Sequence, residues 1–383
     1  MSTATSDDFL SGQGVPVDPH DIETELTRLW GPAAEQVGGP DLENPHVTRI
    51  ALANLVVLGY QNDAARLLPA IETVAAQYPS RTIVMRRTDD PAREVRAEIS
   101  ALCHLPAPGL PQVCSERIVL HAGPNATDLL PGAVRPILEA ELPFVLWWTN
   151  DPRQDEALFR DLADECTRLI LDLPDPGADV KAIRLGLDPT ICAHSRDVAW
   201  FGLTRWRELV AQFFDPPGHQ ATLKRIDAVK IEAVAPTDES APRIAIWLAA
   251  WLAGQLGWTP VGTPQRSEGR LTAAFKSEGG DVAVEITTNA VPAQRVGRIQ
   301  TTTITTRPGG GPCDAESFKL IRVANRYPEV HVEIDSPNYC TLPRTVLVPV
   351  LDPAHRVSAA LESSRIDPPF VKALPHALWL MGG

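Results

Sequence analysis

The chain has 383 residues, a length that predicts two or three domains. Its composition, with 44% hydrophobic and 22% charged residues, is typical of a globular protein. The net charge of -13 argues against a general nucleic-acid binder and against a membrane-surface binder, because both need basic patches.

The first 18 residues are rich in Ser, Asp and Gly, and they predict a disordered lead. They lack the apolar stretch of a secretory signal, and no later segment has the ~20 apolar residues of a membrane span. We therefore expect a cytoplasmic protein whose partners include neither a membrane nor a nucleic acid. A short helix is expected over residues 20–30, where Ile22, Leu26 and Leu29 share one face.

Strands and helices then alternate up to residue 173. Residues 47–60 are apolar enough for either a strand or a helix, and their periodicity does not decide between the two. Pro69 should kink or split the helix that the apolar pattern predicts around it. In chain order, we predict a helix over residues 63–77, strands over 81–86, 95–103 and 113–120, a helix over 128–140, a strand over 144–148, a helix over 155–166 and a strand over 168–173.

This order predicts an α/β N-terminal half, built on a mixed, partly parallel sheet with helices on both faces. Residues 113–173 alternate strand, helix, strand, helix, strand, which predicts parallel strands joined by right-handed crossovers. The two strands before residue 113 are joined by a loop, so we expect them to form an antiparallel edge of the sheet.

A change of pattern after residue 214 predicts a domain boundary. The amphipathic helix predicted over Trp200–Phe214 is ended by Asp215, two prolines and Gly218. We therefore expect an α/β domain over residues 19–217 and an α+β domain over residues 218–383.

The C-terminal half is predicted to be α+β, with an antiparallel meander sheet packed on one long helix. Six short strands separated by turns follow one another from residue 270 onward, without helices between them. Besides these strands, we predict a strand over residues 226–233, the long helix over 244–258, and closing helical turns over 357–363 and 368–380.

The strand predicted over residues 144–148 is followed by a polar turn. Open α/β sheets bind ligands just beyond the carboxyl ends of their strands. We therefore regard Thr149, Asn150, Asp151 and Arg153 as a candidate ligand turn. The alternative is that the two adjacent tryptophans of this strand serve only in packing. The sequence contains no dinucleotide-binding, phosphate-loop or nucleophile-elbow motif, so no catalytic residue and no cofactor are expected.

The six cysteines form no C-x-x-C pair, and neither a disulfide framework nor a metal site is predicted from them. Cys114 lies at the start of a predicted strand and is a candidate redox thiol. The alternative is a packed or exposed thiol without a redox role, because Arg117 is the one cation near it in the sequence.

Several stretches of the sequence together resemble the OpcA family of glucose-6-phosphate dehydrogenase assembly proteins. The resemblance extends in order over about residues 45–380, and it is carried by ALANLVVLG, YPSRTIVM, QVCSERIVLHAGP, LEAELPFVLWWTNDP, RLILDLPD, WFGLTRWRELVAQFFDP and IAIWLAAWLAGQLGW. It implies a non-enzymatic assembly factor and allosteric activator that binds glucose-6-phosphate dehydrogenase in the oxidative pentose phosphate pathway. The family offers no catalytic residues to assign.

Trp and Arg are favoured anchors of protein interfaces. The candidate partner-binding residues are therefore Trp200, Arg205, Trp206 and Arg207 on the predicted helix. The alternative is a packed helix with ordinary solvated arginines beside it. A second hypothesis for the function is a sugar-phosphate-binding enzyme or sensor, in which Arg153 meets the phosphate. A third is an interaction module with an unrelated client.

Overall fold

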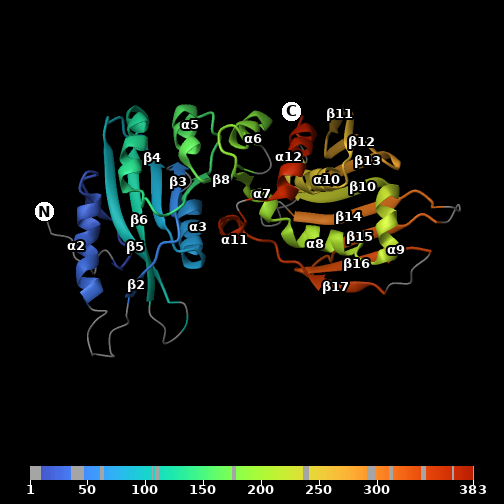
Figure 1. The fold of residues 1–383 in the computed structure, drawn as a ribbon, viewed down its shortest axis with the longest axis horizontal. Helices are drawn as coiled ribbons and strands as arrows, with labels where there is room; N and C mark the ends of the chain where they lie inside the picture. Colours follow the sequence, from blue (N-terminus) through green and yellow to red (C-terminus); the bar gives the residue numbers. More distant parts are fainter. Residues whose placement is uncertain are drawn as a thin grey trace. The chain divides into compact units, whose positions relative to one another are not determined.

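The computed structural model describes residues 10–35, 47–60, 64–105, 107, 112–174, 178–235, 241–290, 298–309, 314–337, 342–364 and 366–382. The chain divides into two compact units (Figure 1). Unit 1 consists of Met1–Leu173, Leu185–Asp197 and Pro353–Arg365, and unit 2 of Pro174–Arg184, Val198–Asp352 and Ile366–Gly383. The predicted boundary after residue 217 is between domains that fold separately. A division into compact units does not test that, so the boundary stays a prediction. Residues 1–9 of the predicted disordered lead lie outside the described residues.

Unit 1 is built on a sheet of nine strands in the described part of the chain. Neighbouring strands follow the order β1-β5-β6-β4-β3-β7-β8-β9, and β2 pairs with β6. Residues 47–60, which the periodicity left open, form β2 and β3. The strands are β1 (Val15–Val17), β2 (Val47–Arg49), β3 (Asn54–Tyr60), β4 (Arg81–Arg87), β5 (Val95–His104), β6 (Gln112–Ala122), β7 (Phe144–Trp148), β8 (Arg168–Leu171) and β9 (Ser195–Asp197).

Every neighbouring pair in the series β6-β4-β3-β7-β8-β9 is parallel. Counted along the chain from β3, and leaving out β5, this is the order 3-2-1-4-5-6 of a doubly wound sheet. The parallel strands predicted over residues 113–173 are confirmed. The predicted antiparallel edge is wrong for β4, although β5 does run antiparallel to β6. Residues Arg81–Met85 are all buried, and a strand buried on both faces belongs inside a sheet.

Helices cover both faces of this sheet, as predicted. Helix α2 (Ile22–Glu35) lies on the face of Glu116, whose carboxylate accepts a 2.7 Å hydrogen bond from Trp30 Nε1. Helix α3 (Ala64–Gln77) lies on the opposite face, where Leu67 and Arg117 line one cavity. The two faces differ because consecutive side chains of a strand point to opposite sides. The other helices of unit 1 include α5 (Glu156–Glu165) and α11 (Pro353–Glu362).

Proline had different effects in two predicted helices. Helix α3 includes Pro69 without being split. The helix predicted over residues 128–140 is broken into η3 (Pro124–Leu129), α4 (Leu130–Val134) and η4 (Arg135–Ile137). Pro131 and Pro136 lie at the starts of the second and third pieces, where the missing N–H is best tolerated.

Unit 2 contains a sheet of eight strands in the described residues, in the order β11-β12-β13-β10-β14-β15-β16-β17. Neighbouring strands are antiparallel except β10 and β13, which are parallel. The meander is therefore interrupted, because β10 inserts between β13 and β14. The predicted fold class, α/β followed by α+β, is confirmed. The strands are β10 (Ile226–Ala235), β11 (Thr259–Ser267), β12 (Arg270–Ser277), β13 (Gly280–Ala290), β14 (Arg298–Thr306), β15 (Ser317–Arg322), β16 (Glu329–Asp335) and β17 (Arg344–Leu347).

The long helix of unit 2 is α10 (Arg243–Gln255), which packs beside α12 (Pro368–Leu380) and against β10. It ends three residues before the predicted end, ahead of Gly257, whose φ is +65°. The helix predicted over residues 200–214 is two helices, α7 (Val198–Phe201) and α8 (Thr204–Gln212). The remaining helical elements are α6 (Val180–Gly186), which contributes to both units, α9 (Pro217–Gln220) and η5 (Ala221–Arg225).

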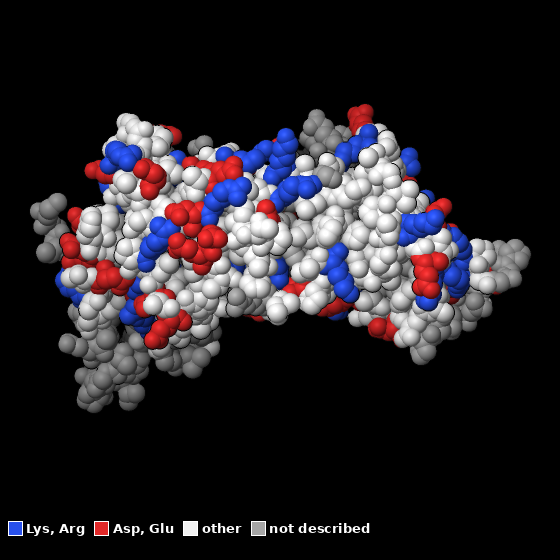
Figure 2. Space-filling model, turned by 45° about the horizontal axis from the view of Figure 1, so that its top comes forward, with Lys and Arg blue, Asp and Glu red and all other residues white. Residues whose placement is uncertain are grey.

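Basic and acidic side chains lie intermixed on the face drawn in Figure 2. Ion pairs between such side chains occur in unit 1: Arg93 Nη2 lies 2.8 Å from Asp128, and Arg135 Nη2 lies 2.8 Å from Asp161 and 2.7 Å from Glu165. None of the described helices combines the length and the apolar character that crossing a membrane requires.

Candidate functional site

The parallel strands of unit 1 have a topological switch point between β3 and β7. From β3 the chain adds β4 and β6 on one side of the sheet, and from β7 it adds β8 and β9 on the other. Doubly wound sheets bind ligands at this point, beyond the carboxyl ends of the strands. The candidate ligand turn, Thr149 to Arg153, directly follows β7, and Tyr60 ends β3 beside it. The structure thus brings the turn to the position where such folds carry their ligands.

Polar groups at the switch point bond to one another. Thr149 Oγ1 donates to the carbonyl oxygen of Leu58 at 2.6 Å, which ties the turn to β3. The hydroxyl of Tyr60 donates to Asp155 Oδ2 at 2.6 Å, and Arg87 Nη2 lies 3.5 Å from Asp155 Oδ1. Burial and the bond to Asp155 raise the pKa of Tyr60 above its usual value. Sequence patterns missed Tyr60 and Arg87, because β3, β4 and α5 meet here only in the folded sheet.

Arg153, the cation of the candidate ligand turn, forms an ion pair with Asp151 of the same turn. Arg153 Nε lies 3.0 and 3.1 Å from the two carboxylate oxygens of Asp151, and Arg153 Nη2 lies 2.5 Å from Asp151 Oδ2. These bonds lower the pKa of Asp151. The guanidinium expected to meet a phosphate therefore already binds a carboxylate. Asn150 Nδ2 donates to Thr149 Oγ1 at 3.2 Å.

Replacing Arg153 by glutamine should lower the free energy of unfolding by only about 0.5 kcal/mol at neutral pH, because the ion pair is partly exposed. The pKa of Asp151 is lower in the folded chain than its ordinary 3.8. The stabilisation is therefore present above that value and is lost as the pH falls through the folded-state pKa. Urea unfolding of the wild type and of Arg153→Gln gives the difference in their free energies of unfolding at neutral pH and at about pH 2. If this difference is as large in acid as at neutral pH, this account is contradicted.

The sequence after β3 lacks the middle glycine of a dinucleotide-binding loop. Gly59 and Ala64 stand at the first and third positions of the G-x-G-x-x-G/A pattern, but Gln61 stands at the second. That glycine lets a pyrophosphate approach the backbone. Residues 61–63 lie outside the described part of the chain. A Cβ at Gly59 would meet Leu67 Cδ2 at 2.4 Å, so this glycine permits the close packing of α3 on β3.

The two candidate tryptophans of the partner-binding group lie inside unit 2. Trp200 is 0% exposed, and its Nε1 donates to Asp367 Oδ2 at 2.8 Å. Trp206 is 3% exposed, and its Nε1 donates to Thr302 Oγ1 at 2.9 Å. Both indoles therefore hold unit 2 together, and a partner meeting the surface does not reach them.

The two candidate arginines differ in their surroundings. The guanidinium of Arg207 lies 3.5 Å from the centroid of the Trp200 ring, and burial lowers the pKa of Arg207 to about 10. Arg205 is half exposed, and its Nη1 lies 2.9 Å from Glu208 Oε2. Of the four candidates, Arg205 is thus the most exposed to a partner. The apolar periodicity of α8 places Trp206 inside, but it does not show that Arg207 folds over Trp200 of the preceding helix.

Cys114 forms a disulfide with Cys103, across the antiparallel pair β5 and β6. The candidate redox residue is therefore one half of a cross-strand bond. The sequence contains a signal for it, because a hairpin centred between residues 108 and 109 places residues 103 and 114 opposite each other. Two further cysteines of unit 1, Cys166 and Cys192, are thiols with their sulfur atoms 3.6 Å apart.

The described residues include no group of three or more His, Cys, Asp or Glu side chains placed to hold a metal ion.

Two domain families match most of the sequence. Residues 71–185 match the family described as the glucose-6-phosphate dehydrogenase subunit N-terminal domain, from OpcA. Residues 193–374 match the corresponding C-terminal domain. The chain belongs to the OpcA family. The resemblance seen in the sequence is confirmed.

Curated proteins that resemble the chain are also described as OpcA. The OxPP cycle protein OpcA of Synechococcus elongatus is 30% identical over 212 residues, which cover 54% of this chain and 44% of that protein. The OpcA of Nostoc punctiforme is 28% identical over 200 residues, with coverages of 51% and 42%. The matched part of the chain thus spans less than half the length of these relatives.

A solved dehydrogenase structure shares the fold. Glucose-6-phosphate 1-dehydrogenase from Mycobacterium avium aligns over 86% of this chain and 91% of its own length, with a TM-score of 0.51 and 10% identity. A 3-ketoreductase from Actinomadura kijaniata aligns over 86% of this chain and 95% of its own length, with a TM-score of 0.45 and 13% identity. At 10% identity, the likeness to the Mycobacterium avium enzyme concerns the fold alone.

Proposed function

We propose that the chain is a non-catalytic assembly factor and allosteric activator of glucose-6-phosphate dehydrogenase in the oxidative pentose phosphate pathway. The observation that supports this most is the ordered match to both domains of the glucose-6-phosphate dehydrogenase subunit family, over residues 71–185 and 193–374. The relatives are also described as proteins of the oxidative pentose phosphate cycle.

The switch point of unit 1 supports a role without catalysis. Dehydrogenases of this fold bind their dinucleotide there, with a glycine at the position of Gln61. In this chain the polar groups at the same edge bond to one another, through Tyr60 to Asp155 and Arg153 to Asp151. Because these polar side chains already bond to one another, they are less available to bind a dinucleotide. This supports a regulatory role for the fold.

The test is a titration of the chain into glucose-6-phosphate dehydrogenase from the same organism. We expect the apparent KM of the enzyme for its substrate to change, and the enzyme's oligomeric mass in light scattering to shift. If neither quantity changes at concentrations that saturate binding in a pull-down, the proposed activation and assembly are excluded.

For the contact surface, we predict that replacing Arg205 by glutamate weakens the binding of the dehydrogenase by roughly tenfold, as expected for a charged interface anchor. The matched control is Arg160→Glu in α5, because Arg160 is also about half exposed and also pairs with a glutamate of its own helix. Binding measured by interferometry should be unchanged in the control. Equal losses in the two variants would show that general charge, and not this position, governs the association.

The alternative function, a sugar-phosphate enzyme or sensor, depends on Arg153 at the switch point. A phosphate would have to replace Asp151 as the partner of Arg153. Thermal unfolding with glucose 6-phosphate and 6-phosphogluconate separates the two proposals. Stabilisation that Arg153→Gln abolishes would support the sensor, and unchanged unfolding temperatures would exclude it.

A further inference from the structure

One face of the unit 1 sheet is built differently from that of a regular doubly wound fold. Between β4 and β6 such a fold has a crossover helix, which covers both strands on the face that α3 occupies. In this chain the connection is made by β5, which extends the sheet instead and runs antiparallel to β6. Next to α3, the sheet face over β4 and β6 therefore lacks the cover of that helix.

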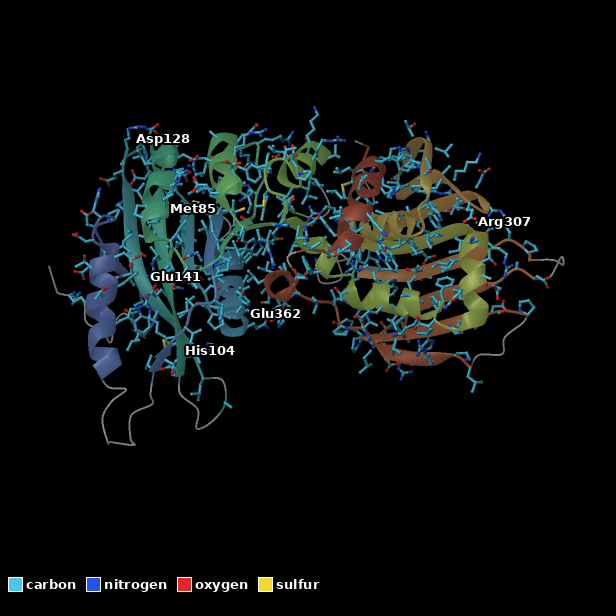
Figure 3. The ribbon with its side chains drawn as sticks, viewed as in Figure 1. Met85, His104, Asp128, Glu141, Arg307 and Glu362 are labelled. Carbon is cyan, nitrogen blue, oxygen red and sulfur yellow. A yellow bond between two sulfur atoms is a disulfide. The ribbon has the colours of Figure 1, made fainter. Side chains whose placement is uncertain are left out.

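The strand register places ionisable side chains on this face. Arg86 of β4 lies opposite His121 of β6, and Arg117 of β6 lies opposite Ser100 of β5. These residues share the α3 face, because side chains two positions apart in a strand point the same way. Met85, labelled in Figure 3, precedes Arg86 in β4 and marks this part of the sheet, while His104 marks the far end of β5.

A cavity of about 130 Å³ lies between α3 and this face. Its apolar walls include Leu67 and Leu68 of α3 together with Val84 and Val119 of the sheet, and its cationic groups are Arg86 and Arg117. The volume is several times the ~10–15 Å³ that a single water needs. The cavity is therefore large enough for a small organic molecule.

The cationic side of the cavity has buried polar atoms without partners. Among the described residues, no hydrogen-bond partner reaches the buried Nε of Arg86. The buried Nε2 of His121 makes no close hydrogen bond there, although Glu98 Oε1 lies 3.6 Å from it. Arg117 is more completely bound: its Nε donates to Ser100 Oγ at 3.0 Å and its Nη2 donates to the carbonyl oxygen of Gly12 at 2.7 Å. A buried donor that lacks a partner is costly, and a bound acceptor at Arg86 would remove that cost.

Acidic groups near the cavity set the charge of the ligand. Glu98 lines it, with Oε1 3.6 Å from His121 Nε2, and Glu72 Oε1 lies 3.9 Å from Arg117 Nη1 at the rim. Burial lowers the pKa of His121, which favours its neutral form. Glu98 and the more exposed Glu72 thus compensate much of the charge of the two arginines. A ligand with one negative charge is therefore favoured over a ligand with two.

We propose that this cavity binds a small organic acid that has one carboxylate and a short apolar body. The carboxylate meets Arg86 and Arg117, and the apolar body contacts Leu67, Leu68 and Val119. A doubly charged phosphate is disfavoured by Glu98 and by the apolar walls. Gly59 and Tyr60 at the end of β3 also line the cavity, so it adjoins the switch point, but its described lining does not include the turn of Thr149 to Arg153. The proposal does not depend on the activation of a dehydrogenase.

The experiment titrates the full chain with butanoate, butanamide and inorganic phosphate in a calorimeter. We expect saturable binding of one butanoate per chain, with binding of butanamide and of phosphate at least about tenfold weaker, because a hydrogen bond to a charged group is lost or the second charge is repelled. Arg86→Met should weaken butanoate binding by about tenfold or more. It should leave the unfolding temperature of the ligand-free chain equal or raised, because an incompletely paired guanidinium is removed.

Two further variants keep the test decisive. Arg93→Met removes an exposed arginine of unit 1 that pairs with Asp128, and it should bind butanoate as the wild type does. Leu68→Trp, at a partly exposed position of α3, should block binding by filling the cavity while both arginines remain. The proposal is overturned if butanoate does not bind saturably below about 10 mM, if butanamide or phosphate binds as tightly, or if Arg86→Met and folded Leu68→Trp bind like the wild type.

Discussion

Replacing Glu116 by alanine is expected to lower the free energy of unfolding of unit 1 by about 3 kcal/mol, because it removes the buried carboxylate partner of a buried guanidinium. Arg81 keeps ion pairs with Glu23 and Glu139, but these carboxylates are 51% and 41% exposed. The side chains of Glu116 and Arg81 are 2% and 3% exposed, and Arg81 Nε lies 2.7 Å from Glu116 Oε2. Glu116 Oε1 also accepts from Trp30 Nε1 at 2.7 Å and lies 2.7 Å from Arg49 Nη2. One substitution thus removes the acceptor that joins α2, β2, β4 and β6.

The matched control is Glu139→Ala, because Glu139 also contacts Arg81, at 3.0 Å, but is 41% exposed. It should cost about 1 kcal/mol or less, as exposed ion pairs do. Urea unfolding gives both free energies, and hydrogen exchange of the amides in β4 and β6 assigns the loss to unit 1. A loss for Glu116→Ala no larger than that of the control would show that solvent reaches Arg81 and compensates it.

This buried pair illustrates what the sequence predicts and what it leaves undetermined. The apolar runs predicted β4, β6 and β7, because strands covered on both faces must be apolar almost throughout. The sequence does not specify that β4 lies beside β6, since β5 intervenes along the chain and was taken as the partner of β4. Without that register, Arg81 and Glu116 are two unrelated charged residues. The Arg86 and Arg117 cavity was missed for the same reason.

The candidate partner-binding group shows a second limit. Its residue types are those of interface anchors, but Trp and Arg also pack together inside a protein. Apolar periodicity describes one helix at a time, and here the chain breaks between α7 and α8 at Gly202 and Leu203. The break places Trp200 and Arg207 on different helices, where the guanidinium can lie over the indole. Packing between the two helices therefore decides which of the four candidates faces solvent.

Trp200→Ala should destabilise unit 2 by about 3–5 kcal/mol, as large-to-small changes of a buried aromatic side chain do. Trp200 lies edge-to-face with Trp247 and Phe370, at centroid distances of 5.6 and 5.4 Å. Its indole N–H bonds Asp367, whose other oxygen caps α12 by accepting from the amide of Phe370 at 3.1 Å. The substitution therefore opens a cavity, loosens the start of α12 and leaves Arg207 without the ring it covers.

Trp200→Phe separates these contributions. It keeps an aromatic ring but loses the bond to Asp367, so we expect a smaller loss of about 1–2 kcal/mol by urea unfolding. The same variant tests whether Trp200 belongs to the partner surface. If the chain activates the dehydrogenase as proposed, folded Trp200→Phe should do so like the wild type, because the indole is fully buried. Arg205→Glu should need roughly tenfold more protein for the same activation. Reduced activation by folded Trp200→Phe would mean that unit 2 opens around α7 when it binds its partner, and that the buried indole becomes part of the interface.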